Sequence, residues 1–161
     1  MATFKIVKIN SKYCNYLRKF DNKVAFNAGS KELRPFIGIL FKVNEYEYFA
    51  PLSSPKAKHL KMKNKIDFIK IDSGKLGAVN FNNMIPVQKT NYELIDINKQ
   101  DIKYQLLLQS QLMWLNRNNS SIRGKALNLY NKYKTGKLPE NILNVCCNFT
   151  LLEQKCEEFN K

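Results

Sequence analysis

The stretch PFIGILFKVNEYEYFAPL, residues 35–52, contains two strand-like segments separated by a single polar residue. Residues 35–43 are apolar and rich in branched and aromatic side chains, and residues 45–52 alternate, with Tyr46, Tyr48 and Ala50 on one face. Both patterns are typical of β-strands. Because Asn44 and its neighbour can form a tight reversal, the stretch predicts an antiparallel hairpin.

More strands and one helix are predicted on either side of this hairpin. Three further segments have strand-like composition: residues 3–9, 66–71 and 78–87. The last two flank the turn sequence DSGKLG and predict a second hairpin. Residues 11–20 carry aromatic and aliphatic side chains at helical spacing, whereas residues 21–34 are polar and predict a long loop.

From about residue 98 the apolar side chains recur at helical spacing. Helices are predicted at 99–118, at 120–137 with Gly136 as the stop, from Pro139 onward, and from a capping box of Thr150 and Glu153. The order of segments predicts one α+β domain over residues 1–161. We expect a small, strongly curved antiparallel β-sheet or barrel, with helices mainly in the C-terminal half.

The chain is strongly basic, with a formal net charge of +14. Such a charge favours a polyanionic partner, since each neutralised phosphate releases condensed counterions. No 18-residue apolar run predicts a membrane span, and the N-terminal residues lack the features of a secretory signal, so we expect a cytoplasmic protein. The four cysteines match neither a zinc site nor a redox pair and are predicted to be buried free thiols.

Positive charge is densest just after the second strand of the first hairpin, in SSPKAKHLKMKNK (53–65). This segment holds two serines, five lysines and the only histidine of the chain, and it contains no acidic residue. Lysine and serine side chains bind phosphate oxygens, but a solvated loop has the same composition. Three interpretations therefore stay open: a solvated loop, a phosphate-contacting loop, and a catalytic site.

Most phosphate-processing enzymes need motifs that the chain lacks. Neither GSKELRPFIG nor DSGKLG has the spacing of a nucleotide-binding loop, and the acidic residues are too scattered to predict a magnesium site. RNA carries its own nucleophile, the 2′-OH, so an enzyme need only orient it, offset charge on the phosphate and move two protons. Catalysis by this segment would thus be RNA cleavage without metal or cofactor, using Ser53, Ser54, Lys56 and either a catalytic or a structural His59.

Five motifs, in their order along the chain, resemble the ToxN/AbiQ family, the endoribonuclease toxins of type III toxin–antitoxin systems. They are INSKYCNYL, RPFIGILF, YFAPLSSPKAKH, GAVNFNNMIPV and CNFTLLEQKCEEF. The resemblance runs over nearly the whole chain, and APLSSPKAKH and NFNNMIPV are its most specific pieces. It implies a compact barrel-like sheet with added helices, akin to the MazF/Kid-type toxins.

The same resemblance implies an activity and a partner. The activity would be sequence-selective, metal-independent cleavage of single-stranded cellular or phage RNA, leaving a 2′,3′-cyclic phosphate and a 5′-hydroxyl. The partner would be an RNA antitoxin of short pseudoknotted tandem repeats that occupies the active-site groove, in a closed ring of alternating protein and RNA units. Neither DNA nor a membrane is expected as a partner. The biological outcome would be growth arrest, often as abortive-infection defence against phage.

The functional positions of the family carry over residue by residue. Its Thr/Ser-Ser-Pro-Lys motif stands here as Ser53-Ser54-Pro55-Lys56, so Ser54, helped by Ser53, would hold the scissile phosphate and Lys56 would stabilise its charge. Its basic residue before the FIG strand falls on Arg34, where the family pattern has lysine. Because arginine stays charged, Arg34 is expected to clamp the phosphate rather than move a proton, and Lys31 is a candidate substitute.

The N-terminal tyrosine of the family falls on Tyr13, which would orient or stack beside the cleaved nucleotide unless it is a core aromatic residue. The remaining residues expected to contact RNA are Lys31, Lys58, His59, Lys61, Lys63, Lys65, Gln109 and Gln111. The main rival hypothesis is a non-catalytic RNA-binding module, which the ends of the RNA products would distinguish. Binding to anionic membranes is disfavoured, since no predicted helix pairs a broad basic face with a clean apolar one.

Overall fold

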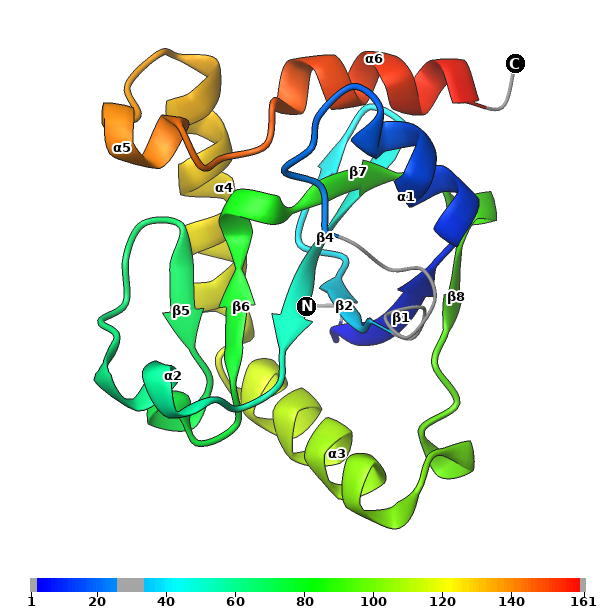
Figure 1. The fold of residues 1–161 in the computed structure, drawn as a ribbon, viewed down its shortest axis with the longest axis vertical. Helices are drawn as coiled ribbons and strands as arrows, with labels where there is room; N and C mark the ends of the chain where they lie inside the picture. The colour runs from blue at the N-terminus through cyan, green and yellow to red at the C-terminus, as the bar shows by residue number, and fades with distance from the viewer. Residues whose placement is uncertain (1–2, 26–33, 160–161) are drawn as a thin grey trace.

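A computed structural model of the chain describes residues 3–25 and 34–159 (Figure 1). Its strands are β1 (Lys5–Ile9), β2 (Phe36–Gly38), β3 (Lys42–Val43), β4 (Tyr46–Ser53), β5 (Phe68–Lys70), β6 (Ala78–Asn80), β7 (Ile85–Val87) and β8 (Tyr92–Leu94). Its α-helices are α1 (Ser11–Arg18), α2 (Ala57–Lys61), α3 (Ile102–Arg117), α4 (Asn119–Lys134), α5 (Glu140–Leu143) and α6 (Phe149–Phe159). Four of these six helices follow the last strand, which confirms the α+β arrangement.

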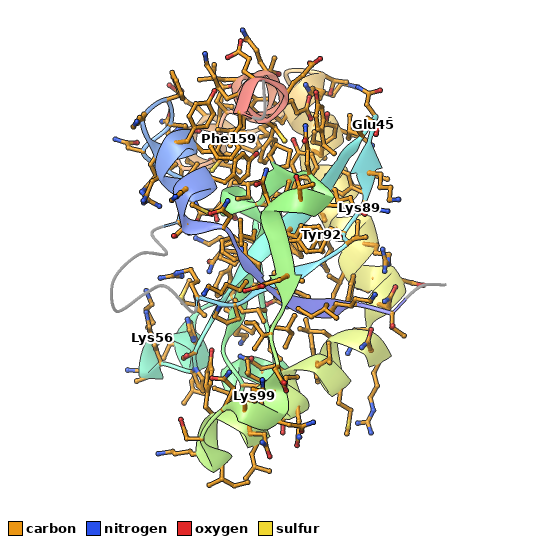
Figure 2. All side chains as sticks on the ribbon, turned by 90° about the vertical axis from the view of Figure 1, so that its right-hand side faces the viewer. Glu45, Lys56, Lys89, Tyr92, Lys99 and Phe159 are labelled. Atoms are coloured by element: carbon orange, nitrogen blue, oxygen red, sulfur yellow. The ribbon has the colours of Figure 1, made fainter. Side chains whose placement is uncertain are left out.

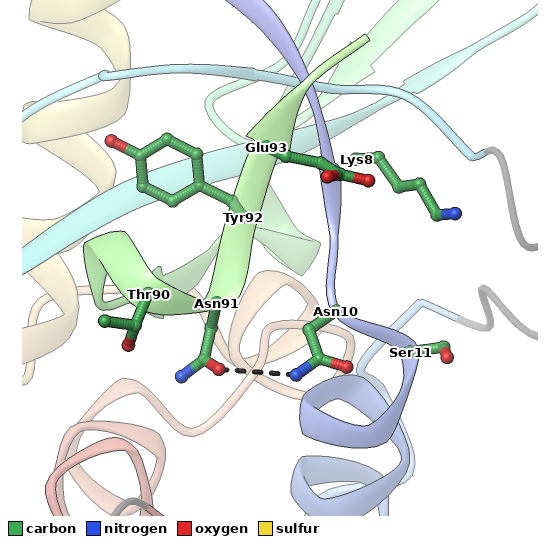
Figure 3. Close-up of a pocket in the computed structure, with 7 residues that line it drawn as sticks. All are labelled: Lys8, Asn10, Ser11, Thr90, Asn91, Tyr92 and Glu93. Carbon is green, nitrogen blue, oxygen red and sulfur yellow. Dashed lines mark hydrogen bonds between the residues drawn. The ribbon is translucent and has the colours of Figure 1, made fainter.

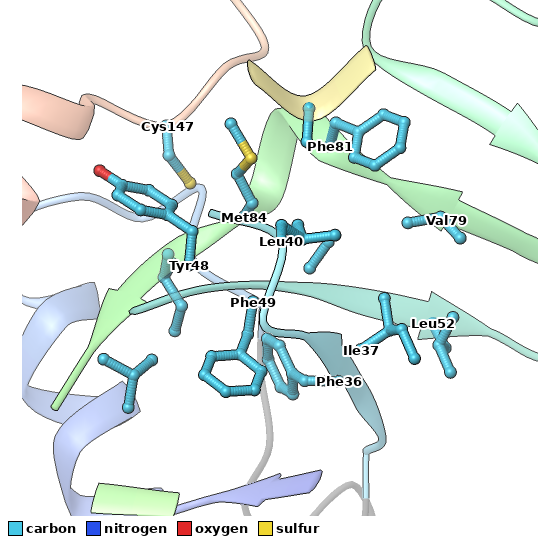
Figure 4. Packing of buried hydrophobic residues seen from close by; sticks show 14 of the residues in the cluster. Phe36, Ile37, Leu40, Tyr48, Phe49, Leu52, Val79, Phe81, Met84 and Cys147 are labelled. Atoms are coloured by element: carbon cyan, nitrogen blue, oxygen red, sulfur yellow. The ribbon is translucent and has the colours of Figure 1, made fainter. Parts of the chain in front are cut away.

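Strand β4 is the centre of the antiparallel sheet. It pairs with β2 and β3, the other arm of the predicted first hairpin, and with β6 and β7. Residues 46–52 are all buried, because β4 has neighbouring strands along both edges and core side chains on its faces. Figure 4 shows this packing, with Tyr48 and Phe49 of β4 among Phe36, Leu40 and Met84. The hairpin predicted from residues 35–52 is therefore the frame of the fold.

The neighbours of β4 bend where a single strand was predicted. Residues 35–43 divide into β2 and β3, and residues 78–87 divide into β6 and β7 around a short 3-10 turn, Phe81–Asn83. Each bend lets one neighbouring segment follow the long, twisted β4 from end to end, which gives the sheet strong curvature. The strand path runs from β5 to β8, and no pairing between these two closes it within the described ranges. The expected antiparallel sheet is confirmed, but the barrel alternative is not.

Strand β8 was not predicted, and it explains an unexpected buried carboxylate. β8 pairs with β1, and the Tyr92 hydroxyl donates a hydrogen bond to Glu47 Oε1 at 2.7 Å. The Lys42 ammonium lies 3.7 Å from Glu47 Oε2. Strand alternation places Glu47 opposite Tyr46 and Tyr48, yet Glu47 is only 1% exposed. A buried carboxylate requires such partners, since an unpaired charge is costly to desolvate.

The C-terminal helices agree with the predicted segments but differ at some of their ends. Helix α6 begins at Phe149 because the side chain of Asn148 caps it, accepting from the Leu151 amide at 3.1 Å. The predicted capping box was therefore wrong: the Thr150 hydroxyl instead accepts from Lys134 Nζ at 3.0 Å. Pro139 precedes α5 rather than starting it, and Gly136 adopts a positive φ of 70° just after α4, as a helix stop does.

The four cysteines are buried free thiols, as predicted.

In Figure 1, α6 lies across the end of the molecule that holds β7 and α1, while α3 runs along the opposite end beyond α2. Within the described residues, no helix combines the length and the apolar composition that crossing a membrane requires.

Candidate active site

Ser53 is the last residue of β4. It pairs with Ala78 of β6, and its hydroxyl accepts a hydrogen bond from Asn80 Nδ2 at 3.0 Å. On the other edge of β4, Leu52 N–H donates to the Pro35 carbonyl at 2.9 Å. Extending the register of the pair Phe36–Pro51 by two residues puts Arg34 at the position opposite Ser53. Strand pairing therefore brings together two of the predicted site residues that are far apart in the sequence.

Arg34 is half-buried beside the end of β4. Burial lowers the pKa of its guanidinium, because the charged form loses hydration. An arginine side chain nevertheless remains a cation at neutral pH. Arg34 is thus a fixed positive charge next to the serine pair, which fits a phosphate clamp.

After Ser53 the chain is extended through Ser54, Pro55 and Lys56, which are all exposed, and then forms α2. The sequence does not predict this short helix, because the composition of the lysine-rich segment is typical of a loop. Pro55 disfavours a helical conformation for Ser54, so the helix cannot extend back to the end of β4. The consequence is an exposed, extended Ser54–Lys56 segment held at both ends by regular structure.

The buried side chain of His59 holds the Ser54–Lys56 segment in place. Its side chain is 2% exposed, and Nδ1 accepts a hydrogen bond from the Lys56 backbone N–H at 3.1 Å. The His59 backbone N–H donates in return to the Lys56 carbonyl at 2.9 Å. The imidazole therefore orients Lys56 through its backbone. The predicted direct contact of His59 with RNA is not supported, because the ring is buried beneath the loop.

The protonation of His59 gives the loop an expected pH dependence. Burial, and then the charges of Lys58 and Lys56, lower the pKa of His59. The folded protein therefore favours the neutral imidazole, which can accept the hydrogen bond from the Lys56 N–H. Its stabilising effect is complete above the ordinary histidine pKa of about 6.5 and is lost as the pH falls below it towards the folded pKa.

We expect His59→Ala to lower RNA cleavage at all pH values, because the Lys56 N–H loses its acceptor. His59→Asn places a non-titrating oxygen near the position of Nδ1 and should retain more activity, with a shallower loss on the acid side. Rate profiles from pH 5 to 8, with thermal unfolding at each pH, test this expectation. Identical acid limbs for wild type and His59→Asn would show that His59 does not control the loop.

The turn between β5 and β6 packs against the backbone of the Ser53–Lys56 loop and of α2. Gly77 adopts φ +98°, and a Cβ atom there would lie 1.9 Å from the Ser53 carbonyl oxygen. Gly74 adopts φ +93°, and a Cβ atom there would lie 2.6 Å from the His59 carbonyl oxygen. The sequence DSGKLG was predicted only as a turn; its two glycines also let this turn pack directly against the backbone of the site.

Gln111 of α3 supports the turn in its place. Its Nε2 donates to the Leu76 carbonyl at 2.8 Å, and the residue is 2% exposed. Gln111 therefore cannot line an RNA groove as predicted, because its side chain is used inside the protein. Gln109, by contrast, is exposed on α3, and its predicted contact with RNA stays a prediction.

Tyr13 was predicted to lie beside the cleaved nucleotide, and the structure places it elsewhere. Its side chain is fully buried, its hydroxyl donates to the Pro86 carbonyl at 2.5 Å, and its ring contacts Phe159 edge-on. Burial raises the pKa of this hydroxyl well above its ordinary value. Helix α1, which carries Tyr13, lies at the opposite end of the molecule from α2 (Figure 1). Tyr13 is therefore a core residue, the alternative that the sequence left open.

The remaining predicted RNA contacts are on the surface around the loop or outside the described ranges. Four lysines after Lys56 are exposed: Lys58, Lys61, Lys63 and Lys65. Figure 2 shows Lys56 on the outer surface of the molecule at the level of α2. Lys31 falls outside the described residues. Asn80 is the site residue that the sequence missed; its position in the NFNN motif, on the strand paired with the end of β4, was the available signal.

A polar hollow of about 310 Å³ lies away from this loop, between the end of β1 and the start of β8 (Figure 3). Its side chains include Asn10, whose Nδ2 donates to Asn91 Oδ1 at 3.4 Å. None of the residues predicted for the site lines this hollow. Among the described residues, no group of three or more histidine, cysteine, aspartate or glutamate side chains is arranged to hold a metal ion.

The loop therefore offers two hydroxyls, one of them oriented by Asn80, a lysine held through its backbone and an arginine across the strand pair. A family model described as "Toxin ToxN, type III toxin-antitoxin system" matches residues 5–157. The chain belongs to the ToxN family.

Individual relatives extend the match over nearly the whole chain. The chain is 32% identical over 164 residues to endoribonuclease ToxN of Bacillus thuringiensis subsp. kurstaki, covering 98% of this chain and 84% of that protein. It is 33% identical over 166 residues to endoribonuclease ToxN of Pectobacterium atrosepticum, covering 98% and 94%. Endoribonuclease AbiQ of Lactococcus lactis subsp. lactis is 28% identical over 169 residues, with 99% and 91% covered.

Solved structures show that the ToxN-family likeness extends to the fold. A type III toxin–antitoxin structure, reported for selective toxin inhibition by a non-coding RNA pseudoknot, has a TM-score of 0.85 and 33% identity over 99% of both chains. AbiQ, described as a lactococcal anti-phage endoribonuclease, has a TM-score of 0.84 and 25% identity over 99% of both chains.

Proposed function

We propose that this protein is an endoribonuclease toxin that cleaves single-stranded RNA and is inhibited by an RNA antitoxin. The observation that carries the proposal is the Ser53–Lys56 loop, held by β4, His59 and the glycine turn, in a chain that belongs to the ToxN family. Its relatives bear the name endoribonuclease, and the net charge of +14 suits an RNA ligand.

The proposed reaction uses the RNA's own 2′-hydroxyl. Its oxygen attacks the adjacent phosphorus, a bond from O2′ to phosphorus forms, and the bond from phosphorus to O5′ breaks. The products are a 2′,3′-cyclic phosphate and a 5′-hydroxyl, with one proton leaving O2′ and one arriving at O5′. The protein need only position the phosphate, stabilise its added negative charge and assist the two proton transfers.

Each residue of the loop has a role in this proposal. The hydroxyls of Ser53 and Ser54 hold non-bridging phosphate oxygens, and Arg34 offsets their charge as a fixed cation. Lys56 is close to the same phosphate and, unlike arginine, can give up a proton, which makes it the candidate donor to O5′. The exposed lysines from Lys58 to Lys65 follow the RNA backbone and supply affinity that salt weakens.

The antitoxin belongs to the same proposal. An RNA of short pseudoknotted repeats would occupy the loop and its lysines, exclude substrate RNA, and join toxin molecules into a closed ring of alternating protein and RNA units. Inhibition of a related toxin by a non-coding RNA pseudoknot supports this partner. The proposed substrates are cellular or phage RNAs in the cytoplasm. We also propose that the fold is related to that of the MazF/Kid-type toxins.

Growth is the direct test of the toxin and its antitoxin together. We expect induction of the wild-type protein alone in a bacterial host to stop growth and to produce new 5′ ends in cellular RNA. If the DNA upstream of the gene carries a tandem array of short repeats, co-expression of its RNA should restore growth, whereas a scrambled repeat should not. Continued growth and unchanged RNA ends at a protein level confirmed by immunoblot would contradict the proposed function.

A further inference from the structure

A second hollow, of about 490 Å³, lies on the sheet outside the loop described above. It is formed by β1, β8, the segment from β2 to β3, and α4. Aromatic walls come from Phe41, Phe49 and Tyr92, and cationic side chains come from Lys5, Lys42 and Arg123. No residue of 53–65 contributes to it. The volume is within the range of about 300–1,000 Å³ in which proteins bind small organic groups.

The aromatic walls are fixed before any ligand arrives. The rings of Phe49 and Tyr92 lie 4.7 Å apart, and the Tyr92 hydroxyl is anchored on Glu47. Phe49 also packs directly over Gly38, where a Cβ atom would lie 2.5 Å from the ring. Phe41 stacks on Tyr48 with ring centroids 4.7 Å apart. Phe49 is itself buried and forms the back of the hollow. Phe41 and Tyr92 are partly exposed and already ordered, so a planar group can stack on these two rings with little loss of side-chain entropy.

The polar groups of the hollow are mainly hydrogen-bond donors. The Arg123 guanidinium is held by Asn119 Oδ1 at 2.7 Å, by the Ile39 carbonyl and by the ring of Phe4 beneath it. Lys5 is exposed at the opening, and Lys42 shares its charge with the buried Glu47. Among the residues that the structure describes, those lining the hollow include no carboxylate. These features match a ligand with a flat apolar face, an acceptor-rich edge and negative charge nearby.

We propose that this hollow binds one unpaired RNA base, with guanine or uracil as the best fit because each presents carbonyl oxygens at its edge. Stacking on Phe41 and Tyr92 supplies affinity, lysine ammonium groups meet the carbonyl oxygens, and the flanking phosphates meet the basic rim. This inference rests on the proposed RNA function and deepens it by adding a base-reading contact away from the cleavage loop.

The base can come from a substrate strand or from the antitoxin, and one experiment separates the two sources. A short single-stranded RNA and a pseudoknotted RNA are each prepared with 4-thiouridine, 6-thioguanosine or an abasic unit at one unpaired position. We expect irradiation of the full-length protein with the thio-bases to crosslink peptides that contain Phe41 or residues 92–94. The RNA that gives this crosslink identifies the source.

Affinity measurements test the pocket independently. Losing one stacked base should weaken binding of the abasic RNA about tenfold or more. Lys5→Glu should reduce this difference between uridine and abasic RNA, whereas Lys137→Glu, the same charge change on an exposed residue that does not line the hollow, should weaken both RNAs equally. Both variants should retain the unfolding temperature of wild type within a few degrees, since both positions are exposed.

Several outcomes would contradict the proposal that this hollow binds an RNA base. They are crosslinks confined to residues 53–65, equal affinity for uridine and abasic RNA, or the same effect from Lys5→Glu and Lys137→Glu. If wild type cleaves RNA while any of these outcomes is observed, the proposed base binding is wrong and the proposed endoribonuclease function stands. If the pocket peptides crosslink but the protein cleaves no RNA, the pocket stands and the endoribonuclease proposal fails.

Discussion

Lys56→Ala is expected to lower the rate of RNA cleavage about 10²–10³-fold, the usual effect of removing one preorganised charge from a developing oxyanion. The change removes the ammonium group and the methylene chain that carries it, and it leaves the backbone of the proposed site intact. The hydrogen bond to His59 uses the Lys56 backbone N–H, so the alanine variant keeps the contact that shapes the loop. Because Lys56 is exposed, no packing is lost either.

Single-turnover cleavage of a defined RNA measures this effect, and circular dichroism with thermal unfolding checks the fold. Lys137→Ala is the matched control, since it removes one exposed positive charge outside the loop and should leave the rate within about twofold of wild type, as expected for a remote surface charge. Equal rates for Lys56→Ala and wild type would remove Lys56 from the mechanism. Equal losses in both variants would mean that only the overall charge matters.

Gly77→Ala is expected to disrupt the site without changing any side chain that is proposed to bind RNA. Alanine at φ +98° costs about 1–2 kcal/mol in backbone conformation alone. The new methyl group would also overlap the Ser53 carbonyl oxygen at 1.9 Å, so the end of β4 must move. A displacement of about 1 Å in a positioned reacting group can lower a rate about 10²-fold, so we expect a cleavage loss of that order together with lower stability.

Gly124→Ala is the matched control for the glycine turn. Gly124 is exposed in the middle of α4, and a Cβ atom there meets nothing within 4 Å. Alanine should therefore stabilise the helix by about 0.5–1 kcal/mol and leave cleavage unchanged. Urea unfolding and cleavage rates of both variants test the pair. A Gly77→Ala protein that matches wild type in stability and rate would show that the turn does not support the loop.

The sequence predicted the centre of the fold because that part depends on local signals. The hairpin of residues 35–52 is marked by apolar, β-branched composition and a polar turn, and the long helices by their apolar spacing. The bend within residues 35–43 was not predicted, because the apolar pattern continues through it. The bend within residues 78–87 falls on the polar stretch NFNN, which was included in a single predicted strand. Both bends arise from the need of two segments to follow β4, which is a tertiary effect.

The candidate site divides in the same way. Ser53, Ser54 and Lys56 were predicted from their own motif, and extending the β2–β4 register by two residues puts Arg34 opposite Ser53. The roles of Asn80, Gly77 and Gln111 depend on contacts between distant segments, which a single sequence does not reveal. Tyr13 and His59 show the opposite difficulty: each residue type suits catalysis, and only burial shows that the first is a core residue and the second a support for Lys56.

The chemical ends of the cleaved RNA test the central claim most directly. Purified wild-type protein is incubated with a defined single-stranded RNA in excess EDTA, and the product ends are identified by mass spectrometry and by their response to polynucleotide kinase. We expect cleavage that EDTA does not abolish, with a 2′,3′-cyclic phosphate on one fragment and a 5′-hydroxyl on the other. A 5′-phosphate with a 3′-hydroxyl, or activity that EDTA removes and Mg²⁺ restores, would contradict the central claim.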